Sequence, residues 1–138
     1  MTQDANVGIG PLAAPERGPA FDAAVPAGGY RWWYLDAISD DGRFALTLIA
    51  FVGSVFSPYY AWSGRRDPRD HCAVNVALYG KHSARWTMTE RRAAAVETTP
   101  SRLRIGPSAL TWRSDGLRID LDEIGAPLPR RVRGAIDV

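Results

Sequence analysis

The most constraining feature of this sequence is a series of short runs in which apolar and polar residues alternate. Turn residues separate the runs, and two of these turns are Asp-Gly pairs, Asp41-Gly42 and Asp115-Gly116. An Asp-Gly pair readily adopts the positive φ that tight hairpins require. Alternation with a period of two places one face of each strand on a core. The chain is therefore predicted to be all-β and antiparallel, as a meander, a sandwich or a barrel.

The alternating runs cover most of the chain after residue 29. We expect strands over Tyr30–Ile38, Arg43–Phe51, Cys72–Tyr79 and Arg85–Thr89, and around Leu103, Leu110, Leu117 and Val132. The run Arg43–Phe51 is apolar on both faces, which predicts a strand that is central or covered on both sides. The one helix candidate is Glu90–Thr99. The last run reaches residue 138 without a closing turn, so the sheet is predicted to be incomplete at its C-terminal edge.

Length and composition limit the domain organisation. A chain of 138 residues is one domain, or a piece of a longer protein. Residues 1–28 are rich in Gly, Pro and Ala without a period, which predicts a disordered N-terminal arm. Phe21 and Val25 are the residues of this arm that we expect to dock on the domain. The folded domain is expected over residues 29–138.

Charge and cysteine content exclude several classes of protein. The net charge is +2, so no strong field for nucleic acid is expected. Cys72 is the only cysteine and cannot form an internal disulfide. With His71 and His82 as the only histidines, no metal site is predicted. The sequence shows neither a signal peptide nor an apolar run long enough for a membrane helix.

Aromatic residues gather in the first half of the chain. Three of the five Trp and four of the five Tyr fall between positions 30 and 62. One interpretation is that they form the core of a small β domain, because large rings dominate cores. The other is an aromatic pocket for a long apolar ligand. The aromatic residues themselves leave both interpretations open.

Longer motifs narrow the choice of family. The relevant segments are Gly29–Asp36 (GYRWWYLD), Ile49–Trp62 (IAFVGSVFSPYYAW), His71–Gly80 (HCAVNVALYG), Trp86–Arg91 (WTMTER) and Ile105–Leu110 (IGPSAL). Together they resemble the bacterial carotenoid 1,2-hydratases, also called hydroxyneurosporene synthases, over roughly residues 28 to 136. The resemblance implies a lipocalin-like fold and a hydro-lyase of carotenoid biosynthesis.

The resemblance also implies a reaction and its participants. Family members add water to the terminal 1,2 double bond of acyclic carotenoids such as neurosporene and lycopene, without a metal or an organic cofactor. Their acid catalysis is associated with a His-x-Trp and a Gly-Tyr-Leu-Asp segment of a C-terminal half. The resemblance covers the N-terminal half only, so we expect this chain to be a fragment and the missing half to be its partner.

Candidate site residues follow from the chemistry of alkene hydration. A carboxylic acid kept protonated by apolar surroundings can protonate a carbon, and aromatic faces can stabilise the cation that results. Asp36, which follows Trp32, Trp33 and Tyr34, fits this description best, although a plain hydrogen-bonding role competes with it. The residues expected to bind the substrate are Trp33, Tyr34, Tyr59, Tyr60, Trp62 and Asn75.

Other roles stay open at this stage. Asp70-His71 could serve as an acid/base pair, but neighbours in a strand point to opposite faces, which favours a structural loop. A non-catalytic lipocalin-type module for an apolar ligand and an inactive fragment are the alternatives to a hydratase. We expect a cytoplasmic protein, with peripheral contact at the inner membrane as a further option.

Overall fold

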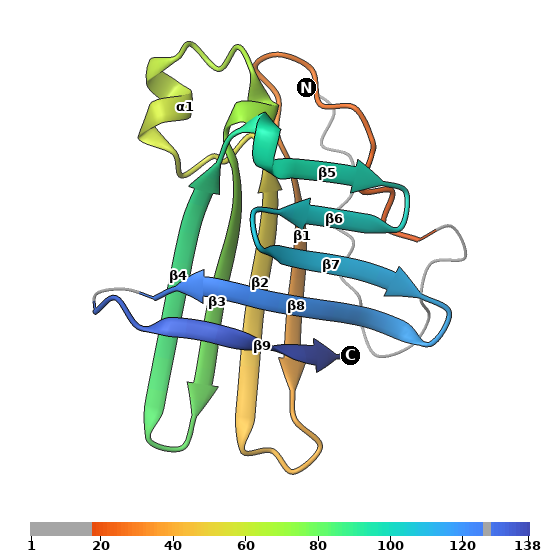
Figure 1. The fold of residues 1–138 in the computed structure, drawn as a ribbon, viewed down its shortest axis with the longest axis vertical. Helices are drawn as coiled ribbons and strands as arrows, with labels where there is room; N and C mark the ends of the chain where they lie inside the picture. The colour runs from red at the N-terminus through yellow and green to blue at the C-terminus, as the bar shows by residue number, and fades with distance from the viewer. Residues whose placement is uncertain (1–17, 126–127) are drawn as a thin grey trace.

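Two antiparallel β-sheets make up the computed structural model, which describes residues 18–125 and 128–138. Sheet A has the order β1 (Arg31–Ile38), β2 (Phe44–Val52), β3 (Cys72–Gly80) and β4 (Ser83–Arg91). Sheet B has the order β5 (Val96–Thr99), β6 (Arg102–Ile105), β7 (Ser108–Arg113), β8 (Gly116–Ile124) and β9 (Arg131–Asp137). The strands of sheet B run across those of sheet A (Figure 1). The prediction of an all-β antiparallel fold is confirmed.

Local turn chemistry sets the register of the hairpins. Gly42 has a φ of 66° in the β1–β2 turn. Gly116, the second residue of the other Asp-Gly pair and the first residue of β8, has a φ of 139°. Both values lie in a region that side chains with a Cβ rarely adopt. The Ser39 N–H donates to the Phe44 carbonyl at 2.9 Å and closes the first hairpin. The two predicted hairpin turns are therefore confirmed.

The core lies between the two sheets and is mainly aliphatic. Sheet A contributes Leu48, Val74 and Val76, and sheet B contributes Leu103 and Ile119, all of them buried. Alternation explains this arrangement, since every second residue of a strand points to the same face. The two sheets are separate in their hydrogen bonding, so the described residues form a two-sheet sandwich rather than one closed barrel.

The segment after β4 corrects one prediction. Residues 90–99, predicted as a helix, continue β4 to Arg91, pass through a 3-10 turn at Ala93–Ala95 and enter β5. Val96 is buried in the core, and β5 pairs with β6 along its length. The run of alanines favoured a helix locally, but it lacks a capping side chain. Burial of Val96 in a paired strand therefore outweighed helix propensity.

Short helical segments connect β2 to β3. Helix α1 (Pro58–Trp62) begins after Ser57, whose hydroxyl accepts the Tyr60 N–H at 3.1 Å. A Ser N-cap followed by Pro is a strong start signal, and the sequence analysis missed it. A 3-10 turn at Pro68–Asp70 precedes β3. These segments lie at the upper end of sheet A in Figure 1.

The N-terminal arm predicted for residues 1–28 falls partly outside the described residues, which begin at 18. From there the chain lies against the domain. Phe21 is 2% exposed and meets the Trp33 ring edge-on, with the ring centroids 5.1 Å apart. The Trp33 indole N–H donates to the Pro19 carbonyl at 2.9 Å. Val25 also packs on the core, so residues 18–28 contribute to the packing of the domain.

Candidate functional site

The face of sheet A that points away from sheet B is the candidate site, and we call it the outer face. Strand register arranges its side chains in four rows. The rows are Trp32–Phe51–Ala73–Glu90, Tyr34–Ile49–Asn75–Met88, Asp36–Thr47–Ala77–Trp86 and Ile38–Ala45–Tyr79–Ala84. Each row crosses all four strands. Phe51 and Ala73 in the middle of the first row are buried, so the exposed part of the outer face consists mainly of the other three rows.

The composition of the outer face is unusual for a sheet surface. Its only charged members are two carboxylates, Asp36 and Glu90. Trp32 is 39% exposed at one edge and Trp86 is 44% exposed at the other. The uncovered face of an antiparallel sheet is normally polar, and a contiguous exposed apolar patch commonly marks a binding surface. The outer face therefore has the character of a contact surface.

Aromatic contacts extend the outer face at its upper end. Tyr30 stacks on Trp32 with the ring centroids 5.0 Å apart and the planes at 8°. Phe56, in the loop before α1, meets the buried Phe51 ring edge-on at 5.5 Å. Between the aromatic edges, β2 and β3 contribute the smaller, partly buried side chains of Thr47 and Ala77. The exposed outer face therefore has large aromatic side chains at its edges and smaller side chains in the middle of its third row.

Asp36 lies in the third row, where two hydroxyls hold its carboxylate. The Tyr34 O–H donates to Oδ2 of Asp36, and the Thr47 O–H donates to Oδ1 at 2.6 Å. The hydrogen bond from Thr47, and then that from Tyr34, lowers the pKa of Asp36 below its usual value. The same contact raises the pKa of Tyr34, because losing its proton beside the carboxylate is unfavourable. These contacts favour the ionised carboxylate.

The structure divides the six residues that were predicted to bind substrate. Tyr34 and Asn75 share the second row of the outer face, next to Asp36. Trp33 points to the opposite side and packs on the core.

The other three predicted residues belong to α1. Tyr60 is buried, and its O–H donates to the Gly29 carbonyl. Tyr59 and Trp62 are 64% and 77% exposed, and their rings meet edge-on at 5.7 Å. The six residues therefore do not converge on one pocket, and only two of them share a face with Asp36.

His71 pairs with a residue that the sequence analysis did not consider. Its Nδ1 lies 2.8 Å from Oε1 of Glu90, and the Tyr60 ring lies 5.1 Å from its own ring. Asp70 instead accepts the Ala93 N–H at 3.0 Å. The Asp70-His71 pair is thus absent, and Asp70 has the structural loop role that the sequence favoured. The pairing of β3 with β4 explains Glu90, since it lies opposite Ala73, two residues after His71.

Cys72 is a poor nucleophile, because it is fully buried at the start of β3. Burial raises the pKa of its thiol to about 11, so the reactive thiolate is scarce near neutral pH. Among the described residues, no three His, Cys, Asp or Glu side chains gather closely enough to hold a metal ion.

A buried carboxylate that the sequence analysis missed links the two sheets. Glu123 of β8 is buried and accepts the Ser108 hydroxyl at 2.8 Å. Its other oxygen lies 3.3 Å from the Arg91 guanidinium of β4. A buried charge requires such partners. The alternation in β8 carried a signal, because Glu123 occupies the same phase as Leu117, Ile119 and Leu121.

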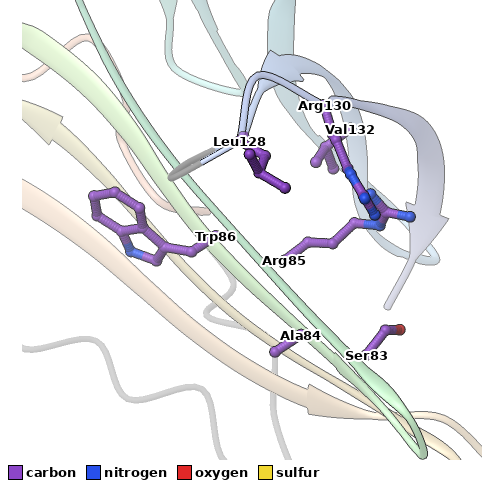
Figure 2. Close-up of a pocket in the computed structure, with 8 residues that line it drawn as sticks. Ser83, Ala84, Arg85, Trp86, Leu128, Arg130 and Val132 are labelled. Carbon is purple, nitrogen blue, oxygen red and sulfur yellow. The ribbon is translucent and has the colours of Figure 1, made fainter.

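A small pocket of about 200 Å³ lies at the edge of β4, next to the outer face. Figure 2 shows Arg85 and Arg130 pointing toward one another across it, while the Trp86 ring turns away. Leu128 and Val132 form its apolar wall. None of the site residues predicted from the sequence lines this pocket, but it shares Ala84 and Trp86 with the outer face.

Comparison with known proteins identifies the family to which the chain is similar. The family model for carotenoid hydratase CrtC matches residues 48–138. An acyclic carotenoid 1,2-hydratase of Thiocapsa roseopersicina is 59% identical over 140 residues, covering 99% of this chain. One from Rubrivivax gelatinosus is 56% identical over 125 residues and covers 87% of this chain. No solved structure matches.

The chain belongs to the carotenoid hydratase family, and the resemblance seen in its motifs is confirmed. It spans 35% of the Thiocapsa relative and 31% of the Rubrivivax relative, about a third of each. Any activity of the longer relatives therefore concerns a protein of which these residues match only a part.

None of the helices in the described residues is long and apolar enough to cross a membrane.

Proposed function

We propose that this chain serves in the hydration of the terminal 1,2 double bond of acyclic carotenoids, as the N-terminal, lipocalin-like part of a longer hydro-lyase. The observation that carries the proposal is the 59% identity to an acyclic carotenoid 1,2-hydratase over nearly the whole chain. Water is the second substrate, and the proton donor belongs to the remainder of the longer protein, where the family resemblance puts it.

The outer face supports an acyclic carotenoid as ligand. Its exposed aromatic side chains are Trp32, Tyr34, Tyr79 and Trp86. A linear polyene gains its affinity from buried apolar area, at about 25 cal/mol per Å². The side chains proposed to contact it are those of Tyr34, Asn75, Trp32 and Trp86.

The other four residues predicted to bind substrate differ in whether their side chains are free to contact a ligand. Tyr59 and Trp62 stay predicted ligand contacts, since their exposed rings lie on α1 at one end of sheet A. Trp33 and Tyr60 are engaged in packing and in hydrogen bonds to backbone carbonyls. We therefore expect their replacement to act on folding before it acts on binding.

A binding module without catalysis is the second candidate for these residues by themselves. It is favoured by the hydrogen bonds that hold Asp36 as a carboxylate, since an ionised group cannot donate a proton to an alkene. The 138-residue chain and a full-length relative should be assayed in parallel with neurosporene and lycopene. We expect both to bind, and only the longer protein to form a 1-hydroxy carotenoid. Product formed by the short chain alone would reject this division of roles.

Contact with a membrane surface is also proposed, because the substrate is apolar. The β1–β2 and β3–β4 turns lie together at the lower end of sheet A in Figure 1. Ile38, Phe44 and Tyr79 beside these turns are exposed, and Lys81 lies in the second turn. Wild type should sediment with vesicles that contain anionic lipid. The double variant Ile38→Asp/Phe44→Asp should remain in the supernatant. Equal recovery of the variant would reject contact through these turns.

A further inference from the structure

The contacts of Asp36 bear on the hydration step itself, within the function proposed above. Alkene hydration needs two proton transfers of opposite sense. One group gives a proton to C2, and the π electrons form the new C–H bond, which leaves a tertiary cation at C1. Water then forms the C1–O bond and must lose one of its protons to become the alcohol. The first transfer requires an acid, and the second requires only a weak acceptor.

The geometry around Asp36 suits the second transfer. Both of its oxygens accept a hydroxyl proton, one from Tyr34 and one from Thr47. An ionised carboxylate has about four acceptor positions. Two positions therefore remain for a water molecule, and the side chain is exposed enough to receive one.

The charges around Asp36 are consistent with this role. On its own strand the nearest titratable group is Tyr34, and β2 contributes the neutral Thr47. The row continues with Ala77 on β3 and Trp86 on β4, and Tyr79 of β3 lies one row away. Glu90, the one charged group that β4 adds to this face, lies two rows away. Hydroxyl donors rather than a cation thus stabilise the carboxylate, and its negative charge stays available to a positive centre.

We propose that Asp36 acts as a carboxylate in the hydration, stabilising the cation at C1 and accepting the proton that the added water releases. The proton given to C2 comes from a donor in the remainder of the longer protein. Asp36 passes its proton to solvent and the donor regains one from solvent, so one alkene and one water yield one tertiary alcohol. In the row Asp36–Thr47–Ala77–Trp86, Ala77 has the smallest side chain, and we place the end of the polyene over it, between the carboxylate and the Trp86 ring.

The test uses a chimera in which this chain replaces the matching residues of the full-length Thiocapsa relative. In Asp36→Asn, kcat for lycopene should fall about 100-fold or more, the usual size of a proton-transfer contribution. KM should change less than about threefold, because polyene binding depends on buried apolar area. Thermal unfolding checks that this isosteric variant folds. A kcat within threefold of wild type, or a fall in kcat no larger than the rise in KM, would overturn the proposal.

The pH profile separates a base from an acid. With Asp36 as the acceptor, kcat falls as the pH drops through the pKa of Asp36. Thr47→Val removes a hydrogen bond that lowers this pKa, so the acidic limb should move to higher pH. Thr111→Val makes the same replacement on β7 of sheet B; it is the control and should leave the acidic limb in place. Activity that rises as the pH falls through this range would make Asp36 the acid. An inactive wild-type chimera would count against the proposed function instead.

Discussion

The two faces of sheet A come from the same four strands, yet they serve different purposes. The core face carries aliphatic residues such as Leu48 and Val76, which are fully buried against sheet B. The outer face carries Trp32, Trp86 and the hydrogen-bonded Asp36. Branched aliphatic side chains interdigitate well in a sandwich, whereas rings with polar tips suit a surface that meets a ligand. The difference shows that apolar character alone does not distinguish a buried core face from the face proposed to bind a ligand.

The largest expected effect concerns two carboxylates, Glu123 buried between the sheets and Asp36 on the outer face. Glu123→Ala leaves the Arg91 guanidinium without its buried partner and should lower the free energy of unfolding by about 3–5 kcal/mol. Asp36→Ala, on the exposed outer face, should cost about 1 kcal/mol or less. Urea denaturation of both variants measures the contrast. Similar losses would mean that the outer face is as important for folding as the core.

Neighbouring apolar residues on β2 provide the next comparison. Leu48→Ala removes a fully buried side chain from the core face and should cost about 2–5 kcal/mol. Ile49→Ala removes a side chain of equal size from the outer face, where it is only partly buried. We expect a loss less than half as large, measured by the same denaturation. If Ile49→Ala proves as costly, the two faces are equivalent in packing.

The smallest expected effect on stability is a dependence on pH. The pKa of Asp36 is lower in the folded chain than its usual value, so the folded state favours the ionised form. Its contribution is present above the unfolded pKa, near 3.9, and is lost as the pH falls through the folded pKa. Between pH 5 and pH 3, wild type should therefore lose more stability than Asp36→Asn. Parallel curves for the two proteins would show that the hydroxyl contacts do not stabilise the carboxylate.

Much of the fold could be predicted from the sequence, because the alternation of apolar and polar residues and the Asp-Gly turns are both local signals. Alternation located the strands of sheet A to within two residues at each end, and the Asp-Gly pairs located two turns. The helix predicted at 90–99 failed, since the pairing of Val96 in a strand is a long-range contact. The apolar character of Arg43–Phe51 on both faces predicts a strand that is central or covered on both sides, and β2 is central, between β1 and β3. What contacts the outer face of β2 cannot be inferred from periodicity.

The candidate site was harder to predict than the strands. Adjacent aromatics such as Trp33 and Tyr34 look equivalent in sequence, but alternation sends one to the core and the other outward. Applying the period of two to the site residues would have separated them. The hydroxyl contacts of Asp36 involve Thr47, eleven positions away, and depend on the register of β1 and β2. Residue types alone therefore suggested an acid where the register provides a carboxylate.

The most direct test of the outer face as the substrate surface is the affinity of Trp86→Ala for lycopene, measured in the full-length chimera with its thermal midpoint. The ring is 44% exposed, so its loss should leave the midpoint within a few degrees of wild type. Its contact with the polyene should be lost, which weakens binding about tenfold, as expected for some 1.4 kcal/mol of buried ring surface. Unchanged affinity, or affinity lost only in step with stability, would contradict the assignment of the outer face.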